Sequence, residues 1–136
     1  MNAVLVNDYD AARELAKAQL KEDIALLYAD KERSVKRREW KKVGKINAAI
    51  NERVIEFNLD YPNEEKYLDL HGMTEKGAVT FVAMMCHGSR GSWKLETGRG
   101  NNSPGKIPVI KSKLLEIYEG SIWVDKNQGI LILEVL

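Results

Sequence analysis

Asp69 and His71 are the residues whose types and spacing best suit chemistry, because one leucine separates them in Leu-Asp-Leu-His-Gly at residues 68–72. Residues 66–70 are predicted to form a strand, in which alternate side chains point to the same face. A carboxylate beside an imidazole can fix the tautomer of the ring and raise its basicity, which suits general acid–base catalysis. We therefore expect Asp69 to orient His71 as a catalytic pair.

A second motif, Thr-Gly-Arg-Gly-Asn-Asn-Ser at residues 97–103, follows a strand predicted over residues 93–97. If the two strands are parallel, this loop lies at the same sheet edge as His71, where open α/β sheets bind ligands. The Arg99 guanidinium would then contact a phosphate and stabilise charge that develops in a transition state, as a third catalytic residue. The expected nucleic-acid contacts from this loop and the residues after it are Gly98, Arg99, Gly100, Asn101, Asn102, Ser103 and Lys106.

Positive charge is concentrated in residues 31–45, which hold eight Lys or Arg residues and two Glu, although the chain as a whole has a net charge of only +1. Local clustering of this kind can form a surface for phosphate. One interpretation is a second nucleic-acid contact made by Arg37, Arg38, Lys41 and Lys42. The alternative is a solvated helix face, and the sequence leaves both open.

The chain has two parts with different residue patterns, which meet near residues 61–63, and their helices and strands must position these motifs. Before that point, apolar residues recur every three or four positions, which predicts two amphipathic helices in an antiparallel hairpin. Asp8 or Asp10 could cap the first helix, and the basic stretch around Ser34 is the expected junction. We therefore predict a helical hairpin extension over residues 1–62 and a separate domain over residues 63–136.

The second part alternates short strands and helices in the order strand, helix, strand, helix, strand, strand. Thr74 is placed to cap the first of these helices and Pro108 to lie in the first turn of the second. The last two strands, residues 121–125 and 130–136, should pair through a tight turn. This order predicts an α/β (α+β) fold with a four-stranded mixed sheet and two helices.

Residues 68–72 and 97–100 together resemble the two signatures of the Smr (small MutS-related) domain. The first part of the chain resembles the helical extension that precedes this domain in eukaryotic Smr proteins. The resemblance implies a nuclease, and in particular an endonuclease acting on mRNA at stalled ribosomes in no-go decay. Many relatives carry a histidine just before the glycine loop, where this chain has Glu96-Thr97, and others have one where this chain has Asn102. His71 is therefore the one imidazole expected in the site.

Three functions follow from these observations. The first is an endoribonuclease in which His71 acts as acid or base; since only one carboxylate is expected in the site, we predict metal-independent chemistry with no metal and no cofactor. The second is a DNA-nicking endonuclease. The third is a non-catalytic module that binds RNA or ribosomes through the basic band and the loop around Arg99.

The composition limits the setting of these functions. Hydrophobic residues make up 44% of the chain and charged residues 30%, as in a soluble globular protein, and no apolar run is long enough to span a bilayer. A single cysteine excludes an internal disulfide. We expect a cytoplasmic monomer that does not associate with membranes, with mRNA, and stalled or collided ribosomes, as its partners.

Overall fold

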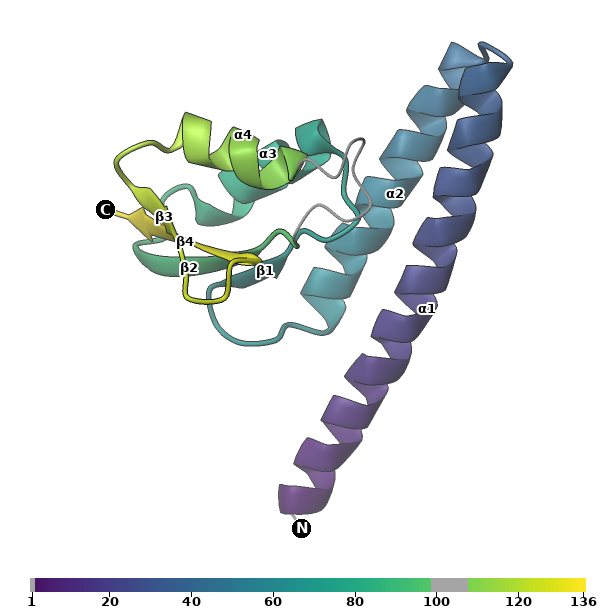
Figure 1. The fold of residues 1–136 in the computed structure, drawn as a ribbon. Coiled ribbons are helices and arrows are strands. Elements are labelled where there is room, and N and C mark those ends of the chain that lie inside the picture. The colour runs from purple at the N-terminus through teal and green to yellow at the C-terminus, as the bar shows by residue number, and fades with distance from the viewer. Residues whose placement is uncertain (1, 99–107) are drawn as a thin grey trace. The chain divides into compact units, whose positions relative to one another are not determined.

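The computed structural model describes residues 2–98 and 108–136, and side chains from Asp8 onward within these ranges. The chain divides into two compact units, Met1–Tyr61 and Pro62–Leu136. The first is helical and the second combines a sheet with two helices (Figure 1). No helix among the described residues combines the length and the apolar character needed to cross a membrane.

The first unit is a hairpin of two long helices, α1 (Asn2–Lys36) and α2 (Trp40–Asp60), which confirms the predicted arrangement (Figure 1). The apolar stripe of α2 is buried at Ile46, Ile50, Val54 and Phe57. These positions follow the three- and four-residue spacing of one helix face. Packing between the two helices therefore buries the stripe that the sequence predicted.

Two details of the hairpin differ from the prediction. Helix α1 begins at Asn2, so Asp8 and Asp10 lie inside the helix and do not cap it. The junction lies at residues 37–39, and not around Ser34, which is a buried residue of α1. The charged residues around Ser34 interrupt the apolar pattern without ending the helix, because the exposed side of a long helix tolerates charge.

The second unit has a four-stranded sheet in the order β1-β2-β4-β3. Strands β1 (Tyr67–Asp69) and β2 (Gly91–Glu96) are parallel, while β4 (Ile130–Val135) runs antiparallel to both β2 and β3 (Ile122–Val124). The predicted mixed sheet and the closing hairpin are confirmed. The parallel pairing of β1 and β2 also meets the condition set for placing the two motifs at one edge.

Helices α3 (Glu75–Cys86) and α4 (Val109–Ile117) cover one face of this sheet (Figure 1). Thr74 caps α3 as predicted, because its hydroxyl accepts a hydrogen bond from the backbone N–H of Gly77 at 3.1 Å. Pro108 lies one position earlier than expected, as the N-cap of α4. The core between helices and sheet consists of buried apolar side chains that include Leu68, Leu70, Phe81, Val82, Leu95, Leu114, Leu131 and Leu133.

Candidate active site

The parallel pairing of β1 with β2 places Asp69 directly beside Glu96. The preceding pair, Leu68 and Leu95, is buried in the core between the sheet and the helices. Since side chains alternate along a strand, the two carboxylates lie on the face of the sheet opposite α3 and α4. The ladder continues past β1, where the Leu70 N–H donates to the Glu96 carbonyl at 2.8 Å. The last residues of both strands are thus fixed in register.

His71 follows β1 and lies beside Glu96. The imidazole Nδ1 is 3.6 Å from the Glu96 Oε2, and their side chains are 57% and 24% exposed, respectively. The pair is an ion pair only when the ring is protonated. A carboxylate near Nδ1 stabilises the tautomer that carries its proton on this nitrogen. The exposed imidazole is therefore accessible to a substrate.

Tyr67 holds the other oxygen of the same carboxylate. Its hydroxyl donates a hydrogen bond to the Glu96 Oε1. Burial, followed by this hydrogen bond and the charge of Glu96, raises the pKa of Tyr67 well above its ordinary value. The phenol therefore stays protonated and remains a donor throughout the physiological pH range, which orients Glu96 toward His71.

Asp69 fixes the backbone that carries His71. Its carboxylate is buried at 5% exposure, and its Oδ1 accepts a hydrogen bond from the backbone N–H of His71 at 3.0 Å. A side chain that bonds the backbone two residues ahead stabilises a tight turn. The predicted pair is thus brought together, with Asp69 acting on the main chain as well as lying close to the imidazole.

Gly98 makes room for the imidazole. A Cβ atom at this position would lie 2.7 Å from the His71 Nε2, and the residue has a φ of +74°. Both the space and the left-handed conformation favour glycine. The N–H groups of Thr97 and Gly98 both donate to the Gly129 carbonyl, at 2.8 and 3.2 Å. The β3–β4 turn therefore anchors the segment against which His71 lies.

Asp69, His71 and Glu96 form a group that could hold a metal ion, because one ligand atom from each lies within 4.8 Å of the others. Carboxylate and imidazole ligands suit Mg²⁺, Mn²⁺ or Zn²⁺. The expectation of a single carboxylate in the site is therefore wrong, since the strand register brings a second one to His71.

Comparisons of this chain with protein-family models, curated proteins and solved structures found no match.

The structure describes some of the residues that the sequence predicts for the site. Asp69, His71 and Gly98 are brought together. The other predicted loop residues lie outside the described residues; they are Arg99, Gly100, Asn101, Asn102, Ser103 and Lys106. Sequence reasoning missed Glu96 and Tyr67. The available signal was the position of Glu96 near the end of the predicted strand that follows the one carrying Asp69.

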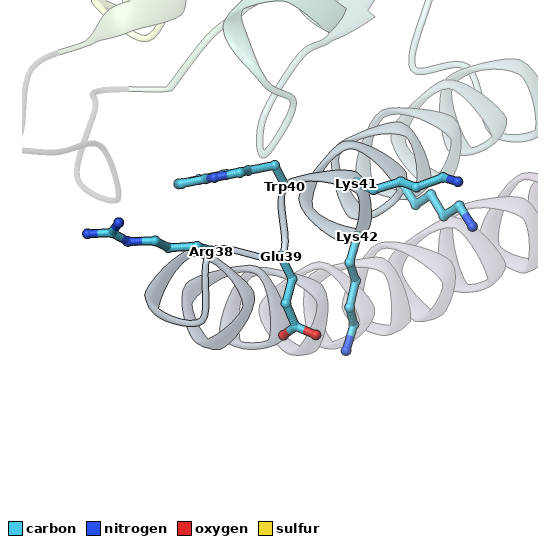
Figure 2. A pocket seen from close by; sticks show the side chains of 6 residues that line it. Arg38, Glu39, Trp40, Lys41 and Lys42 are labelled. Atoms are coloured by element: carbon cyan, nitrogen blue, oxygen red, sulfur yellow. The ribbon is translucent and has the colours of Figure 1, made fainter.

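The predicted basic contacts lie in the first unit, at the junction of its two helices. Arg38, Lys41 and Lys42 line a shallow open pocket there (Figure 2), and Arg37 is the neighbouring exposed residue.

Cys86 in α3 is buried, and burial raises the pKa of its thiol to about 12. A thiol that remains protonated is a poor nucleophile, so Cys86 has a packing role.

Proposed function

We propose that the second unit is an endoribonuclease whose acid–base group is His71. One observation carries the proposal: an exposed imidazole lies beside the Glu96 carboxylate at the adjacent ends of two parallel strands. General acid–base catalysts require a titratable group near neutrality that is accessible and held in one orientation. The resemblance of residues 68–72 and 97–100 to the Smr signatures supports RNA as the substrate, in particular mRNA at stalled ribosomes in the cytoplasm.

The proposed reaction is internal transfer at a phosphodiester. His71 takes the proton of a ribose 2′-hydroxyl, and the 2′-oxygen then attacks the adjacent phosphorus. The bond from phosphorus to the 5′-oxygen breaks, and that oxygen receives a proton from water or from the imidazolium. The products are a 2′,3′-cyclic phosphate and a 5′-hydroxyl.

Each neighbour of His71 has a separate role in this scheme. Glu96 fixes the ring through Nδ1, so that Nε2, on the side of Gly98, is the nitrogen that exchanges protons. Asp69 holds the backbone of the turn. Arg99, which follows Gly98 in the sequence, would stabilise the charge that develops on the phosphate.

A second mechanism is favoured by the proximity of Asp69, His71 and Glu96. In it, these three side chains would hold a divalent ion, which would supply Lewis-acid chemistry at the phosphodiester. This mechanism needs no 2′-hydroxyl, so it applies to DNA as well as RNA. The two mechanisms therefore predict different substrates and different responses to chelators.

The deciding experiment compares three labelled oligonucleotides of one sequence: RNA, DNA, and DNA with a single ribose. Each is incubated with the purified protein in EDTA and in Mg²⁺ or Mn²⁺. Cleavage in EDTA that requires the ribose supports the first mechanism. Cleavage that needs a metal ion and ignores the ribose supports the second.

The chain supplies a matched control for the imidazole. It has two histidines, and His87 is an exposed residue at the other end of α3 from Thr74. His71→Ala should reduce cleavage by about 10²–10⁴-fold, the usual contribution of a general acid or base, whereas His87→Ala should leave it unchanged. If His71→Ala cleaves as well as the unmodified protein, His71 is not the acid–base group and the proposal fails.

A further inference from the structure

The tip of the helical hairpin presents an exposed aromatic ring, Trp40, in a segment rich in lysine and arginine. Arg38, Trp40, Lys41 and Lys45 line the shallow pocket together with Glu39 and Lys42. Figure 2 shows the side chains of Arg38 and Trp40 extending in the same direction away from the helices. Trp40 is 61% exposed, which is unusual for the largest apolar side chain. The ring therefore has open faces next to positive charge.

The cations around Trp40 differ in whether they are paired. Lys42 forms an ion pair with Asp30 at 3.5 Å, and Lys36 one with Glu32 at 3.7 Å. Arg38, Lys41 and Lys45 are exposed and form no ion pair within residues 8–98 and 108–136. These three charges are available to an anion.

Arg38 occupies a position where glycine would be less strained. Its φ is +59°, and its N–H donates to the Val35 carbonyl at 3.0 Å, while the Glu39 N–H donates to the Ser34 carbonyl at 2.9 Å. This pair of hydrogen bonds is the Schellman motif, whose left-handed residue is most often glycine. Arg38 therefore holds a cationic side chain at the tip at a cost in backbone strain that glycine would avoid.

Gly44 is a glycine at a position where the helix would favour another residue. It lies inside α2, where alanine would favour the helix, and a Cβ built there would meet no atom within 4 Å. Packing therefore does not require glycine. Gly44 is one helical turn after Trp40, the spacing at which side chains on a helix touch.

From these observations we infer that the hairpin tip binds single-stranded RNA, with one base stacked on Trp40 and phosphates contacted by Arg38, Lys41 and Lys45. Exposed aromatic rings next to cations bind single strands because every base can stack and every linkage carries a charge. The choice of RNA over DNA rests on the function proposed above. The tip is formed entirely by residues of the first unit, whereas His71 belongs to the second.

Binding is tested in the full chain with His71→Ala, so that the RNA stays intact. The probe is a short fluorescein-labelled oligouridylate, and the Kd is measured by anisotropy over a series of salt concentrations. Trp40→Ala should weaken binding roughly ten-fold, while Trp40→Phe should retain most of the affinity. Trp123→Ala is the matched control, because Trp123 is also exposed, at 49%, but lies in β3.

Two further substitutions separate binding from folding. Arg38→Gly should maintain or raise Tm, yet weaken binding and reduce the slope of log K against log salt by about 0.7, the effect of one lost phosphate contact. Lys21→Ala replaces an exposed lysine of α1 about four turns before the tip and should leave both the affinity and the slope unchanged.

The outcomes for the tip and for the nuclease are separable. If tip variants bind as tightly as the parent, or if polyglutamate binds the tip and oligouridylate does not, the inference is overturned even where the unmodified protein cleaves RNA. If the tip variants lose affinity while the unmodified protein cleaves nothing, the tip site stands and the nuclease proposal fails. Equal binding of oligodeoxythymidylate and oligouridylate would overturn the preference for RNA.

Discussion

The imidazole Nδ1 of His71 lies 3.6 Å from the Glu96 Oε2, although the two residues come from different strand ends and are far apart in the sequence. The contact depends on the register that pairs Asp69 with Glu96. It links the two sequence motifs physically, because Glu96 immediately precedes the Thr-Gly-Arg-Gly segment.

Substituting Glu96 tests this contact. Glu96→Gln keeps the shape of the side chain but removes the charge that lies beside the imidazole. We expect cleavage to fall about ten-fold at neutral pH, because the ring loses the carboxylate that holds its orientation. Glu134→Gln changes another glutamate of the same sheet, one that bonds to Ser92, and should leave the cleavage rate unchanged. An unchanged rate in Glu96→Gln would show that Glu96 does not act on His71.

Gly98 provides a test of the space beside the ring. Gly98→Ala places a methyl group 2.7 Å from the present position of the His71 Nε2 and imposes a left-handed conformation on alanine. The strain should lower the free energy of unfolding by about 1 kcal/mol, and displacement of the ring should lower cleavage by a larger factor. Denaturant unfolding and cleavage rates measure the two effects. Gly120→Ala is the control, since it has a φ of +91° but open space around it, so it should lose stability without losing activity.

Tyr67 makes stability depend on alkaline pH. Burial, and next the hydrogen bond to Glu96, raises the pKa of Tyr67 in the folded chain above its unfolded value of about 10. The folded state therefore retains a proton that the unfolded state releases above this pH, so the contribution is complete below pH ~10 and is lost as the pH rises toward the folded pKa. Tyr67→Phe should lower the free energy of unfolding by about 1–2 kcal/mol at neutral pH.

The measurement for Tyr67 is denaturant unfolding of the unmodified chain and of Tyr67→Phe between neutral pH and pH ~11. The difference between their free energies of unfolding should narrow as the pH rises above the ordinary pKa range of tyrosine. A constant difference for Tyr67→Phe would contradict the role given to its proton.

Ser34 is a point where the hairpin can be stabilised. Its side chain is buried at 1% exposure, and its hydroxyl has no hydrogen-bond partner among the described residues. Ser34→Ala removes an unsatisfied polar group and improves helix propensity, so it should raise the free energy of unfolding by about 1 kcal/mol. Ser89→Ala, in the loop after α3, should not. A loss of stability in Ser34→Ala would indicate that the hydroxyl is satisfied by a group such as water.

The fold was largely predictable because its signals are local. The spacing of Ile46, Ile50 and Val54 predicted a helix face, and Thr74 predicted the start of α3, since both depend on neighbours within one or two turns. The helix boundaries at Asn2 and Lys36 were not predicted, because charged residues neither require nor forbid the end of a helix.

The site was predictable only in part for the same reason. Asp69 and His71 are close in sequence, so strand periodicity brings them together. Glu96 reaches His71 through a pairing between strands, and Tyr67 reaches Glu96 across the same pairing. Neither contact has a signature in the neighbouring residues, and each depends on a register that the sequence does not specify.

The shortness of β1 has a consequence for how the molecule would lose activity. This three-residue strand lies at the edge of the sheet and pairs with β2 alone. Edge segments with few hydrogen bonds open at lower free energy than the core. Fraying there would separate Asp69 and His71 from Glu96 while the rest of the sheet stays closed. Moderate heating should therefore abolish cleavage reversibly below the global transition, with the Leu70 amide exchanging its hydrogen before those of β4.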